Sequence, residues 1–207
     1  MLKGIISAFG VYSRIPVPKI KAEESDLRYM LCFFPWVGAV IGVCVFLWRM
    51  ACEKLGIGEI CFVLTGTAIP LIITGGFHAD GFLDVSDSLC SYGSREKKLE
   101  ILKDPHCGAF AVIRLCSYFL AYFALCTCVQ FTPRVGALWT LALVLERTLS
   151  GYAVAAFPMA KNTGLAHTFA TAADKTTVRR VLTVLAVVLA ACMMFLRGWA
   201  LVLAALA

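Results

Sequence analysis

Charge is scarce in this 207-residue chain. Only 15% of the residues are Asp, Glu, Lys or Arg and three are His, whereas 60% are hydrophobic. Soluble domains usually contain about 25% charged and about 45–50% apolar residues. The apolar residues gather in runs that reach the roughly 20 residues needed to cross a bilayer. The composition therefore argues against a soluble domain and predicts an all-α, polytopic membrane helix bundle.

Several other signals are missing. The ten cysteines form no CxxC pair, which argues against a zinc site or a disulfide framework and favours buried apolar thiols. No internal repeat, second domain or cleavable signal peptide is evident, so we expect residues 1–207 to form a single integral-membrane domain. The net charge of +6 is read as loop charge, and no nucleic-acid partner is predicted.

Five apolar runs predict membrane spans after a short N-terminal segment. The spans are expected at residues 31–52, 60–77, 108–131, 135–157 and 178–196. Residues 1–18 predict an interfacial helix, with helical apolar spacing over 2–12 and a stop at Pro16 and Pro18. Residues 199–207 would rise only about 14 Å as a helix, so they are an interfacial tail, a half-span or part of a longer run. The expected count is five to six spans.

Polar residues concentrate in two connections. Residues 78–107 form the only long polar insertion between spans and contain a predicted short helix from the N-cap Ser94 to Lys103. Thirteen of the 19 Lys and Arg lie in the N-terminal segment, in this insertion and in residues 158–180, against four in the loops of the opposite side. By the positive-inside rule, the N-terminus and the insertion are expected in the cytoplasm.

Three carboxylates stand together in residues 73–90. If this stretch is helical, Asp84 lies about 40° from Asp80 and Asp87 about 20° to the other side, within an arc of roughly 60°. Like charges on one stripe repel, and a bound cation would offset that repulsion. Oxygen ligands without Cys or His suit Mg²⁺ or Mn²⁺. A solvated acidic helix face is the alternative.

The glycines beside this stripe fit a bulky phosphorylated ligand. Gly75, Gly76 and Gly81 lack a Cβ, so such a ligand could approach the backbone closely. The stripe and the basic residues near it predict a metal-dependent phosphoryl or phosphonucleotidyl transfer.

Three arginines outside the acidic stretch have competing interpretations. Arg14 is an interfacial lipid anchor or a phosphate ligand. Arg114 faces the bundle interior or extends its guanidinium to the interface. Arg147, near the middle of a predicted span beside Glu146, serves packing or binds a phosphate in a pocket. On a helix Glu146 and Arg147 are about 100° apart, so they need not pair.

Several motifs resemble one known family. Residues 75–87, GGFHADGFLDVSD, are similar to the GGxHxDGxxDxxD signature of cobalamin synthase, the adenosylcobinamide-GDP ribazoletransferase family. The other matching blocks, in the expected order, are residues 13–18 (SRIPVP), 33–38 (FFPWVG), 94–96 (SRE) and 102–110 (LKDPHCGAF). Glu146-Arg147 and residues 157–161 match more loosely.

The resemblance implies a late step of cobalamin (vitamin B12) biosynthesis. In it, a ribose hydroxyl of α-ribazole, or of its 5′-phosphate, attacks the β-phosphate of adenosylcobinamide-GDP, and GMP leaves. It further implies Mg²⁺ (with Mn²⁺ as a substitute), the lipid bilayer of a prokaryotic cytoplasmic (inner) membrane, and cooperation with other late enzymes of the pathway.

The resemblance also implies residue roles. Asp80, Asp84 and Asp87 form the metal set, with Asp87 also in the catalytic group. Asp104 is a candidate base or second metal ligand, and His78 helps only if the helix begins after it; otherwise it is a capping or structural histidine. The substrate- and phosphate-binding candidates are Arg14, Gly76, Gly81, Arg95, Lys103, Arg147 and Lys161.

The chain departs from the family pattern in three places. Pro105-His106 replaces the usual Ser-Arg, which removes one expected phosphate-binding arginine. Lys161 stands where Arg is common and lacks the bidentate fork. Family members also usually have one further span.

Two other classes of function are alternatives. A CDP-alcohol phosphotransferase or a prenyl-type transferase also uses carboxylates at cytoplasmic helix ends, but Asp80-Gly81 is not followed by the DGxxAR pattern of the former. A divalent-cation transporter would place its carboxylates near the bilayer midplane, often with a repeated half. Here they follow a span and belong to the polar insertion.

Overall fold

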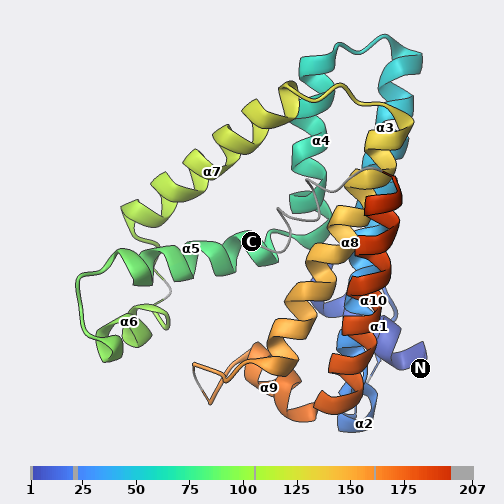
Figure 1. The fold of residues 1–207 in the computed structure, drawn as a ribbon. Coiled ribbons are helices and arrows are strands. Elements are labelled where there is room, and N and C mark those ends of the chain that lie inside the picture. Colours follow the sequence, from blue (N-terminus) through green and yellow to red (C-terminus); the bar gives the residue numbers. More distant parts are fainter. Residues whose placement is uncertain (1, 21–22, 105, 161, 197–207) are drawn as a thin grey trace. The chain divides into compact units, whose positions relative to one another are not determined.

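All secondary structure in the described residues is helical, as the composition predicts (Figure 1). The computed structural model describes residues 2–20, 23–104, 106–160 and 162–196. Its elements are α1 (Leu2–Tyr12), α2 (Glu24–Leu27), the 3₁₀ helix η1 (Met30–Cys32), α3 (Phe34–Leu55), α4 (Glu59–Thr74), α5 (Phe77–Cys90), α6 (Arg95–Ile101), α7 (Ala109–Thr127), α8 (Pro133–Ala156), α9 (Leu165–Ala172) and α10 (Lys175–Phe195).

Within the described residues, fewer helices have the length and hydropathy of a membrane span than the five to six predicted. Among the described helices, α3, α7 and α10 are long and apolar enough to cross a membrane, and α4 with α5 would add a fourth if the bent pair is one span. The run predicted at 60–77 is the 16-residue α4, which is too short to qualify alone. The fourth predicted run is the 24-residue α8, which contains Arg134, Glu146 and Arg147 and is not among the qualifying helices. The tail 199–207 lies outside the described residues.

The chain folds into two compact units, residues 1–51 with 131–207 (unit 1) and residues 52–130 (unit 2). In unit 1, α8 and α10 lie side by side (Figure 1). Their contact buries a core of Leu138 and Leu145 from α8 with Leu189 and Met193 from α10. This pair is the centre of unit 1.

Two glycines one helical turn apart bring α3 close to α8. A Cβ on Gly38 would lie 2.4 Å from the Leu143 carbonyl oxygen, and one on Gly42 would lie 2.5 Å from Cγ2 of Thr140. Small residues four apart allow this close helix–helix approach in membranes. The glycines therefore fix the distance between α3 and α8.

The predicted N-terminal helix is confirmed as α1. Tyr12, at its end, is buried, with its ring centroid 4.0 Å from that of Phe34 and 6.0 Å from that of Phe169. At the same part of unit 1, Arg28 pairs with Asp174 at 3.1 Å. Asp174 also caps α10 by accepting from the Thr177 N–H at 3.1 Å. The α1 end thus packs on α3 and α9.

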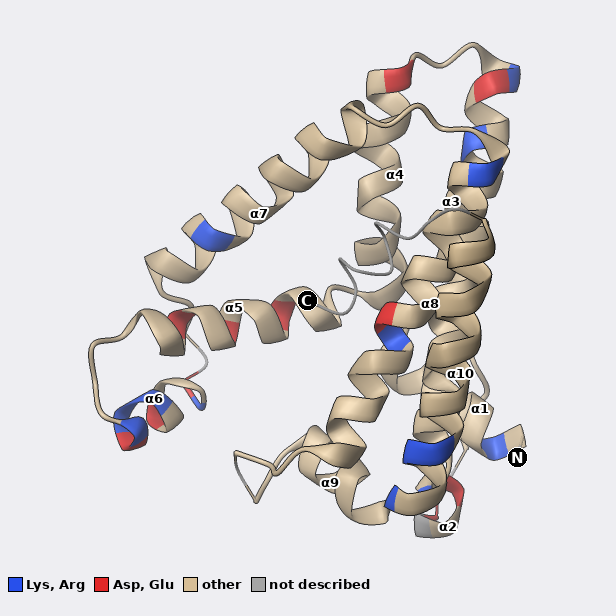
Figure 2. Ribbon diagram, viewed as in Figure 1, with Lys and Arg blue, Asp and Glu red and all other residues tan. Residues whose placement is uncertain are grey.

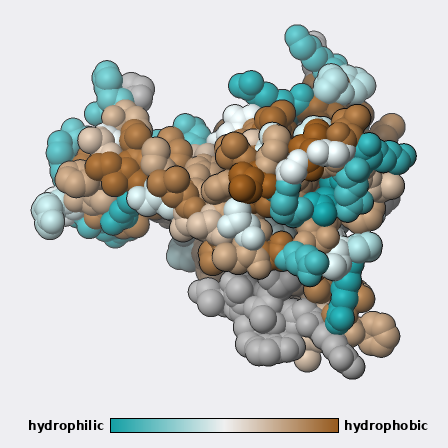
Figure 3. All heavy atoms as spheres, turned by 90° about the horizontal axis from the view of Figure 1, so that it is seen from above, coloured by the Kyte–Doolittle hydropathy of each residue, from teal (hydrophilic) through white to brown (hydrophobic). Residues whose placement is uncertain are grey.

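Unit 2 consists of α4 to α7, with α7 packed along α5 and α4. The rings of Phe82 on α5 and Tyr118 on α7 lie 5.7 Å apart. Much of α7 remains exposed, including Phe110 (64%) and Leu120 (69%). Figure 3 shows such hydrophobic residues widely on the surface, as expected for lipid contact.

All ten cysteines are free, as the lack of paired spacing predicts. Only Cys52 and Cys126 are buried within the chain, so the expectation of buried thiols is wrong for most of them. Apolar helices with few neighbours leave their thiols on exposed faces.

Candidate functional site

Two glycines turn the chain sharply between α4 and α5. Gly75 ends α4 with φ +65° and Gly76 precedes α5 with φ +79°, a left-handed conformation that side chains rarely adopt. The two helix axes meet at 91°. These glycines are thus required for the backbone conformation of the turn. From the sequence alone, we explain them only by the close approach of a ligand.

The acidic stretch is a helix, so its carboxylates share one face as predicted. Asp80, Asp84 and Asp87 all lie on α5, which Figure 2 shows with acidic bands along its length. Asp80 and Asp84 are exposed, whereas Asp87 is half-buried. Gly81 is exposed too, and a Cβ there would meet nothing within 4 Å. The face carrying Asp80, Asp84 and Gly81 is open.

The Asp87 carboxylate contacts the start of α7. Its Oδ2 accepts a hydrogen bond of 3.2 Å from the N–H of Gly108, the residue that begins α7. A carboxylate at a helix N-terminus is stabilised by the unpaired N–H groups and the helix dipole. Asp87 therefore joins α5 to α7.

His78 lies within α5, because the helix begins at Phe77. Helix geometry then places it about 160° from Asp80, away from the carboxylate face. Its ring stands 5.3 Å from that of Phe77 in an edge-on arrangement. The condition under which His78 would help the site, a helix that begins after it, is not met.

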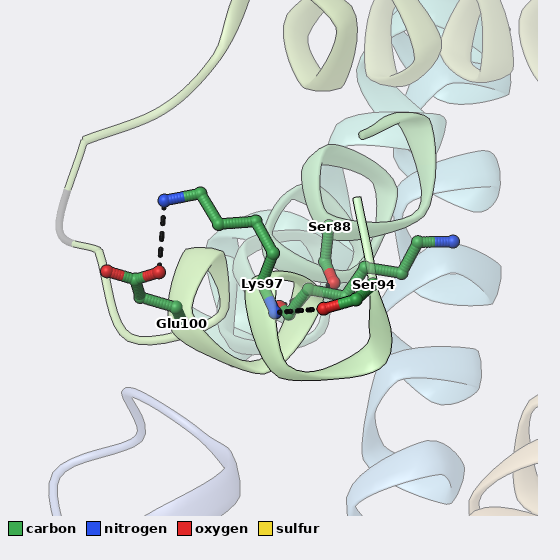
Figure 4. Close-up of polar contacts among 5 residues, drawn as sticks. Ser88, Ser94, Lys97 and Glu100 are labelled. Carbon is green, nitrogen blue, oxygen red and sulfur yellow. Dashed lines mark hydrogen bonds and ion pairs between the residues drawn. The ribbon is translucent and has the colours of Figure 1, made fainter. Parts of the chain in front are cut away.

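The part of the polar insertion that follows α5, residues 91–108, is basic and folds back on α5. Ser94 caps α6 as predicted, accepting from the Lys97 N–H at 3.4 Å, and Lys97 pairs with Glu100 at 3.0 Å (Figure 4). Ser88 of α5, also drawn in Figure 4, donates to the Lys98 carbonyl at 2.8 Å. The predicted phosphate ligands Arg95 and Lys103 are exposed. The short helix ends at Ile101 rather than at Lys103.

Asp104 forms a local pair with His106. Its Oδ1 accepts from the His106 backbone N–H at 2.9 Å and lies 2.6 Å from Nδ1 of the ring. The backbone hydrogen bond, and then the ring contact, hold the pKa of Asp104 below its usual value. The sequence marked His106 only as a departure from the family pattern. Its position two residues from an aspartate was the available signal.

The remaining candidates lie in unit 1 or outside the described residues. Arg14 is exposed, beyond the end of α1. Arg147 is 6% exposed, its Nη1 lies 2.7 Å from the Glu146 carboxylate, and its guanidinium lies 5.7 Å from the centre of the Phe34 ring. Lys161 and Pro105 fall outside the described residues.

Within the described ranges, no group of three or more His, Cys, Asp or Glu side chains is placed to hold a metal ion. Mg²⁺ is usually bound by one or two carboxylates together with substrate phosphates and water, not by an all-protein cage. Exposed carboxylates on Asp80 and Asp84, one turn apart, fit that mode of binding.

Comparison with known proteins gives the family. The family model described as cobalamin-5-phosphate synthase matches residues 4–207. The chain belongs to this family. The match covers both units, including the α5 carboxylates and the insertion, and agrees with the motif resemblance.

The relatives are named for a ribazole transfer. The chain is 45% identical over 174 residues to an adenosylcobinamide-GDP ribazoletransferase of Lachnoclostridium phytofermentans, covering 84% of this chain and 66% of the relative. It is 30% identical over 167 residues to one of Clostridium perfringens (81% and 66%) and 36% identical over 147 residues to one of Listeria monocytogenes (70% and 59%). The matches thus span about two thirds or less of the relatives' length. No solved structure matches the chain significantly.

Proposed function

We propose that the protein transfers the adenosylcobinamide phosphate group from adenosylcobinamide-GDP to α-ribazole or α-ribazole 5′-phosphate. A ribose oxygen forms a bond to the β-phosphorus, the bond from that phosphorus to the GMP oxygen breaks, and GMP leaves. The product is adenosylcobalamin or its 5′-phosphate. The observation that carries the proposal is the open face of α5, with Asp80 and Asp84 exposed in a family match that spans residues 4–207.

Asp80 and Asp84 would hold Mg²⁺, and Mn²⁺ would serve as a substitute. When bound, such an ion neutralises charge on a diphosphate and on the leaving phosphate. Gly81, with open space around its Cα, leaves room for the diphosphate beside the carboxylates. The exposed Arg95 and Lys103 of unit 2 would bind the non-bridging oxygens.

The attacking hydroxyl must lose a proton, and the Asp104–His106 pair is the proposed acceptor. The lowered pKa of Asp104 makes this carboxylate a weak base but a good anionic partner for an imidazole. With Nδ1 beside Asp104, the other ring nitrogen, Nε2, is left to take the proton. The predicted base Asp104 would then act by holding the tautomer of His106.

We place the protein in the cytoplasmic membrane of its prokaryotic source as a multi-pass protein, with the N-terminus and the insertion in the cytoplasm. The three apolar helices support membrane insertion, and the distribution of Lys and Arg supports the orientation. An impermeant thiol reagent tests it with Ser94→Cys in a chain lacking Cys90 and Cys107. Labelling of intact cells from outside would contradict the orientation.

The activity is tested by GMP release from adenosylcobinamide-GDP in membranes that contain the protein. The expected result is release that requires α-ribazole or its 5′-phosphate and is abolished by EDTA. Release without an acceptor would indicate hydrolysis instead. Absence of release with both acceptors would contradict the proposed function.

A further inference from the structure

The last turn of α5 contacts the segment 91–108 at two places. Asp87 accepts from the Gly108 N–H at 3.2 Å, at the point where the insertion ends and α7 begins. The next residue, Ser88, is 4% exposed and donates to the Lys98 carbonyl at 2.8 Å, within α6. Residues 91–108 thus leave α5 and are bound back to it at two places.

Gly108 is shaped around the Asp87 carboxylate. A Cβ on Gly108 would lie 2.0 Å from Oδ1 and 2.6 Å from Cγ of Asp87. The backbone at Gly108, with φ −76° and ψ 155°, is one that alanine adopts without strain. Glycine is therefore needed here for the neighbouring carboxylate and not for its own conformation.

The three aspartates consequently differ in their surroundings. Asp80 and Asp84 are exposed, whereas Asp87 is half-buried with one oxygen on a backbone N–H. A dication bound to the Asp87 carboxylate would compete with the hydrogen bond that this carboxylate accepts from the Gly108 N–H at the start of α7. Mg²⁺ bound to substrate phosphates needs only one or two protein carboxylates, which Asp80 and Asp84 supply.

We infer that Asp87 is a positioning residue that holds the 91–108 insertion against α5 and is not one of the metal ligands. By closing the insertion, it keeps the exposed Arg95 and Lys103 beside the helix that carries Asp80 and Asp84. The effect on catalysis rests on the proposed transferase function. The effect on the insertion does not.

Three substitutions, with a fourth as control, separate the effect of the Asp87–Gly108 contact from the effect of the Asp87 charge. Gly108→Ala keeps all three aspartates but displaces the Asp87 side chain, whose carboxylate is at the end of a rotatable chain. Asp87→Asn removes the charge but keeps an oxygen that can accept from the Gly108 N–H. Asp87→Ala removes both, and Asp80→Ala is the matched control, because it removes an exposed carboxylate from the first turn of the same helix.

The structural test is tryptic cleavage at Arg95, Lys97, Lys98 and Lys103 in the full chain purified in detergent. Cleavage follows the population of the opened insertion, so Gly108→Ala and Asp87→Ala should be cut about tenfold faster or more. Asp87→Asn and Asp80→Ala should stay near the wild-type rate. Equal rates in wild type, Gly108→Ala and Asp87→Ala would overturn the inference, whatever the protein's activity.

The kinetic test separates positioning from metal binding. Gly108→Ala should raise the KM for adenosylcobinamide-GDP about tenfold while leaving the Mg²⁺ concentration for half-maximal rate unchanged. Asp87→Asn should retain most of the activity. If Asp87→Asn instead loses as much activity as Asp84→Asn and needs more Mg²⁺, Asp87 is a metal ligand and the inference is wrong.

Discussion

Two polar regions on apolar helices stand in contrast. On α8, Arg147 is 6% exposed, bound to Glu146 at 2.7 Å and placed over the Phe34 ring. On α5, Asp80 and Asp84 are exposed. The Arg147 guanidinium is thus buried in the fold, whereas the two α5 aspartates are accessible from outside it.

From this difference we expect Arg147 to serve packing and the α5 pair to serve a ligand. Removing a buried, partnered charge disturbs the groups around it and lowers the free energy of unfolding. Replacing exposed carboxylates on one helix face by neutral side chains of the same size removes their mutual repulsion and should leave the fold largely intact. The α5 pair should therefore affect catalysis, and Arg147 should affect stability.

The largest expected effect is at α5. Asp80→Asn and Asp84→Asn are nearly isosteric and each removes one anionic ligand, so each should lower ribazole-dependent GMP release by about 10²-fold or more. Because both act on one ion, the double variant should be little worse than the worse single variant. Raised Mg²⁺ or Mn²⁺ should partly restore a single variant. Wild-type rates in both, with equal amounts of inserted protein, would leave only the solvated acidic face.

The next largest effect is expected on stability, where α3 and α8 approach each other closely beside Arg147. Gly38→Ala would place a Cβ 2.4 Å from the Leu143 carbonyl oxygen and should destabilise by about 2–3 kcal/mol, since backbone must move. Gly66→Ala is the matched control, because its nearest atom would be 3.7 Å away on Phe62. Thermal unfolding in detergent compares the two. Equal melting temperatures would show that the approach is looser than described.

Arg147→Lys tests whether Arg147 serves packing or binds a phosphate. Lysine keeps the charge but loses the planar contact with Phe34 and the hydrogen-bond geometry with Glu146, so stability should fall by about 1–2 kcal/mol. The kcat/KM per folded molecule should stay within about threefold of wild type, because no transition-state contact is lost. A large fall in kcat/KM at unchanged melting temperature would instead make Arg147 a phosphate ligand.

The smallest effect concerns Asp174. The hydrogen bond from the Thr177 N–H, and then the Arg28 contact, hold the pKa of Asp174 below its usual value. A depressed folded-state pKa gives stability that is complete above the unfolded pKa of about 3.9 and is lost as pH falls through the folded pKa. The wild-type melting temperature should thus fall on acidification more than that of Asp174→Asn. Parallel pH profiles would contradict this role.

Local features of the fold were predictable from spacing. The helix at residues 2–12, the α5 stripe and the Ser94 cap follow from side-chain periodicity and capping chemistry alone. The α9 helix (Leu165–Ala172) is not predicted from the sequence, because the polar residues of 158–177 indicate a connection. The 91° bend at Gly75-Gly76 was also missed, because the glycines were assigned to ligand approach.

Contacts between distant residues were beyond the sequence. Asp87 and Gly108 are 21 residues apart, and nothing in their spacing indicates that the Asp87 carboxylate accepts a hydrogen bond at the start of α7. The exposure of Asp80 and Asp84 and the burial of Arg147 depend on which helices pack together. The motif therefore located the candidate site, whereas the different surroundings of its aspartates required the structure.

Metal binding without turnover tests the central claim most directly. Mn²⁺ titrations followed by electron paramagnetic resonance would be made on protein in lipid nanodiscs with adenosylcobinamide-GDP present and no acceptor. We expect one Mn²⁺ ion bound per protein molecule in wild type, Arg147→Lys and Asp87→Asn. We expect this ion to be lost in the Asp80→Asn/Asp84→Asn double variant. Undiminished Mn²⁺ binding in that double variant would contradict the assignment of the α5 carboxylates as the metal ligands.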